Sequence, residues 1–226
     1  MHSLNLSVIA RLLLVGFTLV VAACSSCVVP AAVRQKAQTF SVQTVNGFPS
    51  ASHVSYLGRS QQWANAFGPL GMVVGGVSAM KPEAKLFSAM QALKPGPASL
   101  IEDQVAHELS AIGMRRVASG EDVVVRIGSA YDRIMFSEAA PGTGKSGFQM
   151  VMQLTVVFVD RSGREVWRGR TGGVSIVPWP SLQEMLTSPA TLQRMTREAA
   201  AWSGKRLAGV SPSNISAILL QERAAH

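Results

Sequence analysis

The residue types that carry most enzyme chemistry are sparse in this chain. It has two cysteines, Cys24 and Cys27, and beyond the N-terminal leader three histidines, His53, His107 and His226. His107 follows Asp103 by four residues, a spacing that puts both side chains on one helix face and favours a solvated ion pair over a metal or acid–base site. The sequence contains no metalloprotease helix motif and no nucleophile-elbow serine. We therefore expect no catalytic residue, no metal ligand and no cofactor site.

Cys24 follows an N-terminal segment that is typical of export. Arg11 precedes an uncharged, mostly apolar run over residues 12–23, which ends in Ala22 and Ala23. A basic start, a short apolar run and small residues before a cleavage point describe a secretory signal. The run is too short to span a bilayer comfortably, since spanning takes about 20 apolar residues. Alternatives are an ordinary cleaved signal followed by a chance cysteine, and a signal-anchor helix.

The tetrapeptide Val21-Ala22-Ala23-Cys24 resembles the lipobox of bacterial lipoproteins. The resemblance implies that residues 1–23 are removed, that the Cys24 sulfur carries lipid such as palmitate, and that Cys24 becomes the first mature residue. Several acyl chains hold a protein firmly, at about 0.8 kcal/mol per buried methylene. Ser25 follows the lipid site, which by the same resemblance implies the outer membrane, with the protein facing the periplasm.

The charge balance indicates anionic partners. Lys and Arg total 21 against 13 Asp and Glu, a formal charge of +8. Loss of the leader removes only Arg11, which leaves 20 basic against 13 acidic residues, or +7. Such partners are phospholipid headgroups, cell-wall polymers or nucleic acid. No run of Lys and Arg exceeds two residues, so we expect no nucleic-acid partner and favour a solvated basic surface, with membrane lipid bound through Cys24. Once Cys24 is lipidated, Cys27 has no partner for an intrachain disulfide.

One loop resembles the phosphate-binding loop of nucleotide-hydrolysing ATPases. It runs from Ala139 to Lys145 and Ser146, and Asp160 at the end of an apolar stretch resembles the magnesium-positioning acid. That site requires a helix after the loop, whose N-terminus holds the phosphate. Here the residues from Phe148 alternate as in a strand, and no room is left for a helix and crossover before Asp160. We therefore interpret the loop as a glycine-rich hairpin connection and reject a nucleotide site.

Periodicity predicts the elements that carry the remaining residues. Residues 24–38 read as a tether, and strands are expected at 39–45, 122–128, 148–159 and 165–171, the last two forming a hairpin. Helices are expected at 82–93, at 99–112 with a Ser99–Glu102 capping box and Gly113 as its C-terminal glycine, at 189–207, and in a short form after 213. Trp167 and Trp202 are expected in the core rather than on a binding platform. These elements predict an α/β (α+β) fold, a mixed and partly antiparallel sheet with helices packed on one face.

Residues 60–80 form an uncharged segment whose part 66–80 is rich in glycine. Gly71 and Gly75 have the small-xxx-small spacing that lets helices approach closely. The segment is either a self-association or membrane-inserting element, or a buried glycine-rich loop. Because Pro and Gly lower helix propensity, the buried loop is favoured.

A second resemblance covers residues 99–172. The pattern Asp160-x-x-Gly163-x-x-Val166-Trp167-Arg168-Gly169, after a strand that starts Glu121-Asp122-Val123-Val124, is similar to a signature of small bacterial lipoproteins of unknown function. It implies a compact α/β domain at the envelope and supplies no catalytic residues. With residues 39–226 as one domain, we expect a non-enzymatic envelope lipoprotein that binds another protein or stabilises an assembly. A ligand-binding or hydrolytic domain acting on cell-wall or lipid material is the alternative.

Overall fold

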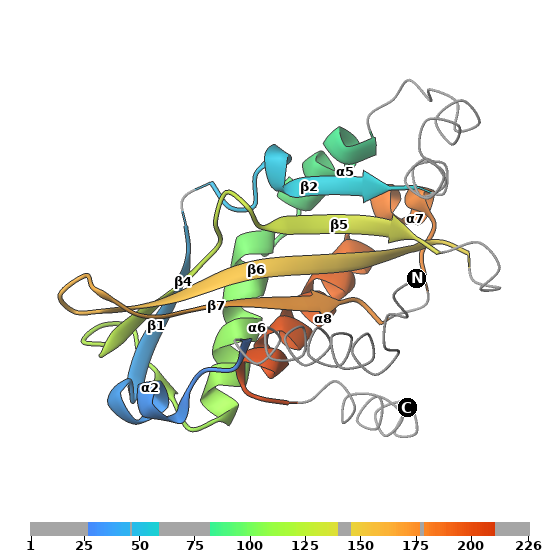
Figure 1. Cartoon of the computed structure of the whole chain (residues 1–226). Coiled ribbons are helices and arrows are strands. Elements are labelled where there is room, and N and C mark those ends of the chain that lie inside the picture. The colour runs from blue at the N-terminus through green and yellow to red at the C-terminus, as the bar shows by residue number, and fades with distance from the viewer. Residues whose placement is uncertain (1–26, 46, 59–81, 140–145, 177–178, 211–226) are drawn as a thin grey trace, which may run out of the picture.

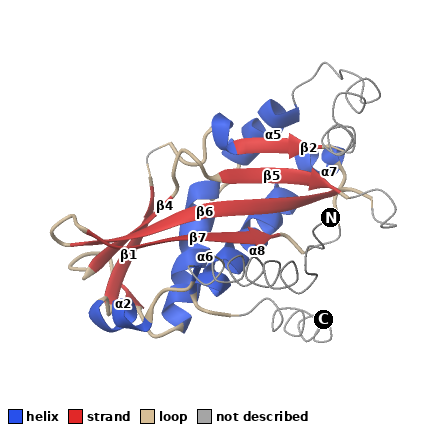
Figure 2. Cartoon of the chain, viewed as in Figure 1, coloured by secondary structure: helices blue, strands red, loops and turns tan. Residues whose placement is uncertain are grey.

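The computed structural model describes residues 27–45, 47–58, 82–139, 146–176 and 179–210. Within these ranges, strands and helices form one α+β body around a seven-stranded sheet (Figures 1 and 2). The strands are β1 Thr39–Thr44, β2 Val54–Leu57, β3 Arg115–Arg116, β4 Val123–Ile127, β5 Arg133–Glu138, β6 Phe148–Asp160 and β7 Glu165–Val174. The helices are α2 Ala31–Lys36, the 3-10 turn η2 Ala51–His53, α5 Pro82–Gln91, α6 Pro97–Ala111, α7 Leu182–Thr187 and α8 Pro189–Leu207.

Strand β6 is the spine of the sheet. Antiparallel β7 lies along one edge of β6, while β5 pairs with its first half and β4 with its second half on the other edge. Outside these, β2 is parallel to β5, and β1 is parallel to β4 and to the short β3. The predicted mixed, partly antiparallel sheet is confirmed, including the β6–β7 hairpin, whose turn contains Gly163 at a φ of +82°.

The alternation of β6 determines where the core lies. Its even-numbered residues face the helices, and those from Met150 to Phe158 are fully buried. Helices α6 and α8 cover this face, and α8 presents Leu192, Met195 and Ala199 to the sheet, all with no exposed surface. A fully buried side chain of that size contributes about 1.5–3 kcal/mol. The predicted arrangement of helices packed on one face is therefore confirmed.

Two glycines allow α8 to approach its neighbours. A Cβ atom on Gly173 of β7 would lie 1.8 Å from the carbonyl oxygen of Ala199. On α8 itself, a Cβ on Gly204 would lie 2.7 Å from Cγ of Glu108 on α6. Both distances are far shorter than a van der Waals contact, so helix α8 can sit this close to β7 and α6 only because neither position has a side chain.

The start of α6 differs from its prediction. The helix begins at Pro97 with Gly96 as N-cap, so Ser99 lies inside it and the expected capping box does not form. Proline at the first helical position is preorganised for a helix start and gives up no hydrogen bond there. The Glu102 carboxylate instead accepts hydrogen bonds from the backbone N–H and the hydroxyl of Thr44, which ties α6 to β1. The expected end at Gly113 is confirmed, with a φ of +90°.

The folded body begins before residue 39. Val29 and Ala37 are buried in the main core, and α2 lies between them. The stretch predicted as a tether over 24–38 therefore contributes to the folded body from Val29 onward. The uncharged segment 60–80, the loop residues 140–145 and the final helix expected after 213 lie outside the described residues.

Candidate functional site

The first described residues are fixed beside the end of α8. The backbone N–H of Val29 donates to the carbonyl oxygen of Leu207 at 2.9 Å, and the Val29 side chain is only 1% exposed. Cys24, the predicted lipid site, lies outside the described residues, five positions before Val29. Five residues span at most about 18 Å when fully extended. Whatever holds Cys24 therefore also holds this end of the body within that distance.

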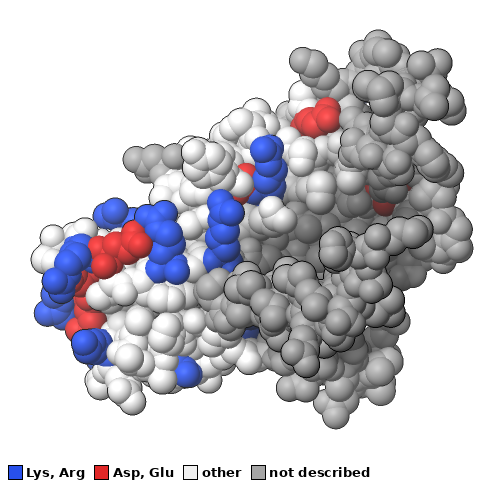
Figure 3. Space-filling model, in the orientation of Figure 1, with Lys and Arg blue, Asp and Glu red and all other residues white. Residues whose placement is uncertain are grey.

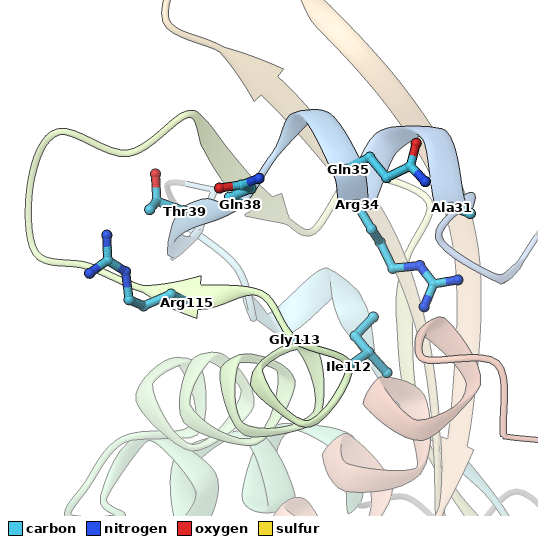
Figure 4. A pocket seen from close by; sticks show the side chains of 8 residues that line it. All are labelled: Ala31, Arg34, Gln35, Gln38, Thr39, Ile112, Gly113 and Arg115. Atoms are coloured by element: carbon cyan, nitrogen blue, oxygen red, sulfur yellow. The ribbon is translucent and has the colours of Figure 1, made fainter.

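A groove of about 540 Å³ lies on this same end of the molecule (Figure 4). It is bounded by α2, by the end of α6 and by the neighbouring starts of β1 and β3. Its polar and apolar lining includes Arg34, Gln35, Gln38, Thr39, Ile112 and Arg115. Figure 4 shows the Arg34 side chain reaching from α2 toward Ile112, while the Arg115 side chain extends from β3 to the side where Thr39 lies, away from Arg34.

Local backbone structure positions the groove. Pro30 precedes α2, and its carbonyl oxygen accepts the first helical bonds of that helix. On the opposite side, Gly113 turns the chain out of α6 so that Arg115 can donate its backbone N–H to the Gln38 carbonyl at 2.8 Å. The parallel pairing of β3 with β1 thus places Thr39 beside Arg115, and α2, which precedes β1, adds Arg34 to the lining of the same groove.

The electrostatics of the groove are positive. Nε of Arg34 is buried and has no hydrogen-bond partner. The bordering carboxylate of Asp122 is already occupied, since it accepts bonds of 2.9 Å from both the backbone N–H and the hydroxyl of Thr39. These bonds, with a smaller contribution from Arg161, hold the pKa of Asp122 below its ordinary value. The groove can therefore receive an anion.

The face of the sheet opposite α6 and α8 is rich in arginine (Figure 3). In the strand register, Arg126 on β4 and Arg168 on β7 flank Val157, and Arg170 lies beside Thr155. Only Arg168 has a carboxylate partner among the described residues, Glu165 at 2.6 Å. Figure 3 shows Lys and Arg side chains spread across this face, with acidic side chains gathered mainly near the β6–β7 turn.

A depression of about 510 Å³ on this face carries an exposed aromatic side chain. Arg168 and Arg170 line it together with Tyr131, which is 76% exposed. Tyr and Arg are the residue types that contribute most to protein interfaces, because both bury a large surface and keep a polar end. We refer to Tyr131, Arg126, Arg168 and Arg170 together as the arginine face.

A buried polar junction lies where β4 gives way to β5 along β6. Thr155 faces the gap between the two strands, and Asp132 supplies the acceptor that a strand partner would otherwise provide. The Asp132 carboxylate, 3% exposed, accepts from the Thr155 backbone N–H at 2.7 Å, from the Thr155 hydroxyl at 2.7 Å and from the Ser129 hydroxyl at 2.8 Å. Sequence reasoning missed this junction, although Gly128-Ser129 before Asp132 is a turn signal.

His53, one of the residues weighed for chemistry, belongs to this junction. Its Nδ1 accepts the backbone N–H of Ser50 at 3.0 Å, and it lies 2.7 Å from the Ser50 hydroxyl oxygen. Since Nδ1 is the acceptor, Nε2 carries the proton and donates to the Ser129 carbonyl at 3.1 Å. The ring also packs edge-on against Phe48 with centroids 5.0 Å apart. Nδ1 thus fixes the ring within the 48–53 loop, and Nε2 joins that loop to the 128–132 loop.

The other sequence-predicted residues lie apart from one another. His107 is exposed on α6, and Asp103 forms its ion pair with Arg116 at 3.0 Å, so the expected pair with His107 is replaced. Trp167 packs edge-on against Phe158 at 5.3 Å, in agreement with the core interpretation. In the described part of the chain, no group of three or more His, Cys, Asp and Glu side chains could hold a metal ion.

The loop that resembles a nucleotide site leads into a strand, as predicted. Residues 140–145 lie outside the described ranges, but Gly147 has a φ of +104° and β6 starts at Phe148 directly after it. Asp160 is the last residue of that same strand. No helix N-terminus therefore follows the loop to receive a phosphate.

Comparisons with known proteins yield only distant matches. No family model matches the chain, and no curated protein does. Similar solved structures include a candidate lipoprotein from Caulobacter crescentus, with 18% identity, 50% of this chain and 81% of that chain covered, and a TM-score of 0.31. A minor lipoprotein from Acinetobacter baumannii has 10% identity over 76% and 91%, with a TM-score of 0.34. The PelC dodecamer from Paraburkholderia phytofirmans has 14% identity over 76% and 89%, with a TM-score of 0.31.

Two of these three neighbours are lipoproteins by name. At TM-scores this low, no property of the neighbours is transferred to this chain. Among the helices that the structure describes, none is both long enough and apolar enough to cross a bilayer.

Proposed function

We propose that the protein is a bacterial envelope lipoprotein, held at the outer membrane by acyl chains on Cys24 and facing the periplasm. Its folded body serves as a non-enzymatic module that binds an envelope protein or stabilises an assembly. The apolar run 12–23 and the small residues before Cys24 support export and lipidation. Acyl chains on one residue suffice to hold a folded body at a bilayer when there are several of them.

The observation that carries this proposal is the position of Val29. Because its N–H is bonded to Leu207 and its side chain is buried, the body starts within five residues of Cys24. A lipid on Cys24 would therefore keep the end formed by α2 and the last turn of α8 next to the headgroups. This end carries Arg34, Lys36, Lys205 and Arg206, charges that suit an anionic surface.

The two cysteines provide a matched test of the anchor. Cys24→Ala is expected to abolish metabolic labelling with palmitate, because the acylated sulfur is gone. Cys27→Ala, three residues away, is expected to label like the parent protein. Labelling that persists in Cys24→Ala, or that is lost in Cys27→Ala, would refute Cys24 as the lipid site.

The arginine face supports the binding part of the proposal. Three arginines and an exposed tyrosine on one side of the sheet favour a partner protein with an acidic surface. A photocrosslinking residue at Tyr131 in intact cells is expected to give a discrete crosslinked product. The same residue at Gln183, exposed on α7 on the helical side, is the control. Equal products from both positions, or none from Tyr131, would argue against this face as the interface.

Self-association through residues 60–80 remains a second proposal for the same class of function. It rests on the Gly71 and Gly75 spacing. Sedimentation of the Cys24→Ala chain beside a Gly71→Leu/Gly75→Leu variant tests it, and a monomer in both cases would exclude this segment as the contact.

A further inference from the structure

We propose that the groove between α2 and the end of α6 is a binding site for a phosphate group, and that its ligand is the headgroup of an anionic phospholipid. The site is lined by Arg34 on α2 and Arg115 on β3, whose guanidinium groups lie toward opposite ends of the groove, and by Gln38 and Thr39 along the chain between them (Figure 4). The location of the ligand at the membrane rests on the lipid anchor proposed above, whereas the affinity of the groove for phosphate does not.

The hydrogen-bond donors that line the groove suit the oxygen atoms of a phosphate group. Guanidinium groups are planar forks of N–H donors that bind phosphate in pairs of parallel hydrogen bonds. Here one guanidinium lies toward each end of the groove, and the Gln38 amide and the Thr39 hydroxyl also line it, so the groove offers donors along its length. The volume of about 540 Å³ exceeds that of a phosphate alone and leaves room for the glycerol part of a headgroup.

An orphaned donor points to a missing ligand. Nε of Arg34 is buried without any hydrogen-bond partner, the one buried side-chain nitrogen or oxygen in the described residues with this property. Buried donors are nearly always paired, because an unpaired one loses its bonds to water without replacement. An anionic oxygen in the groove would supply the acceptor that Arg34 lacks.

The neighbouring acids do not neutralise the site. Among the described residues, neither Arg34 nor Arg115 has a carboxylate within ion-pair distance, although the adjacent Arg116 is paired with Asp103 at 3.0 Å. Asp122, which borders the groove, is bonded to Thr39 and paired with Arg161 at 3.2 Å. The positive charge of the groove is therefore free for an external anion.

The position of the groove selects a lipid as the source of that anion. Helix α2 begins two residues after Val29, so the groove lies on the end of the body that the link to Cys24 keeps within about 18 Å of the anchor. Charges close to an anionic bilayer are attracted to it over roughly one Debye length, about 8 Å at physiological salt. A groove at this end therefore lies close to lipid headgroups, which are present there at a higher local concentration than soluble phosphates.

The test measures lipid preference without the anchor. In the Cys24→Ala chain we compare flotation with vesicles of phosphatidylcholine alone and of phosphatidylcholine mixed equally with phosphatidylglycerol. We expect roughly tenfold stronger binding to the anionic vesicles. Arg34→Gln/Arg115→Gln in the same background is expected to lose most of this preference. Binding that the leader contributes, including the attraction of Arg11 to anionic lipid, is common to all variants, so it cancels when the variants are compared.

The control removes the same charge elsewhere. Arg194 and Arg197 are exposed on α8, and ten residues of helix, about 15 Å, separate Arg197 from the Leu207 end. Arg194→Gln/Arg197→Gln is expected to keep the preference for anionic vesicles. An equal loss in both double variants would show general electrostatic attraction and overturn the site. If the double variant in the groove does not fold, the single variant Arg115→Gln at an exposed position replaces it.

A second readout separates lipid from soluble phosphate. Inorganic phosphate is added to the Cys24→Ala chain and to the groove variant while thermal unfolding is followed. Stabilisation by inorganic phosphate that depends on Arg34 and Arg115, together with an unchanged lipid preference in the variant, would overturn the lipid assignment in favour of a soluble phosphate. Because none of these chains is acylated, the outcome is independent of whether Cys24 is the lipid site.

Discussion

The buried junction at Asp132 gives the sharpest prediction about the fold. The substitution Asp132→Ala removes the acceptor of three hydrogen bonds, all 2.7–2.8 Å long, and leaves the Thr155 N–H, the Thr155 hydroxyl and the Ser129 hydroxyl without it. A buried polar group left unpaired costs about 1–3 kcal/mol. Because the two hydroxyl groups can rotate to other acceptors, we expect a total loss of about 3–5 kcal/mol rather than the full sum.

The assay is urea denaturation of the lipidated protein in non-ionic detergent, followed by the fluorescence of its four tryptophans, among them Trp167, which packs on the core residue Phe158. Asp103→Ala is the matched control, since its side chain is 54% exposed and its ion pair with Arg116 lies at the surface. Surface pairs contribute about 0–1 kcal/mol. Equal destabilisation by the two substitutions, or a loss below about 1 kcal/mol for Asp132→Ala, would refute the role of Asp132 at the strand junction.

Three further predictions test the packing and titration of the fold by the same denaturation assay. Gly173→Ala must displace α8 from β7 and is expected to cost about 1–3 kcal/mol or more, whereas Gly96→Ala, where no atom lies within 4 Å of a new Cβ, is expected to change stability by less than about 1 kcal/mol. Glu102→Ala is expected to lower the free energy of unfolding by about 1–3 kcal/mol, and Ser99→Ala by less than about 0.5 kcal/mol. A larger loss for Ser99→Ala than for Glu102→Ala would show that Ser99 caps the helix after all. Burial raises the pKa of the Glu108 carboxyl group above its ordinary value of 4.5, while Lys205 and His107 lower it. The folded protein therefore holds the carboxyl proton more tightly than the unfolded chain does. As a result, the free energy of unfolding falls as the pH rises from 4.5 through the raised pKa. Glu108→Gln is expected to flatten that decline, and an unchanged pH profile would contradict it.

The elements with long, regular patterns could be predicted from the sequence. Six alternating apolar residues identified β6, and helical spacing placed α8 at residues 189–207, where the structure has it. Strand β2 is only four residues long and β5 alternates without β-branched residues beyond Ile134, so neither has a pattern that stands out from a loop. Their pairing with each other and with β6 depends on contacts distant in sequence.

The candidate sites divide in the same way. Cys24 can be proposed from residues 11–24 because a signal is a local pattern. The groove brings together Arg34, Thr39 and Arg115, which are up to 81 positions apart and meet only through the parallel pairing of β1 with β3. Similarly, the Asp132 junction exists because β4 and β5 share one edge of β6, a topology that no local pattern encodes.

The central claim is that acyl chains on Cys24 hold a body whose first core residue, Val29, lies only five positions away. Intact-mass and N-terminal peptide mass spectrometry of the protein purified from its natural membrane tests this claim directly. We expect a chain that begins at Cys24 and carries the added mass of fatty acyl groups on that residue. A chain that begins upstream of residue 24, or an N-terminal peptide without lipid mass, would contradict it.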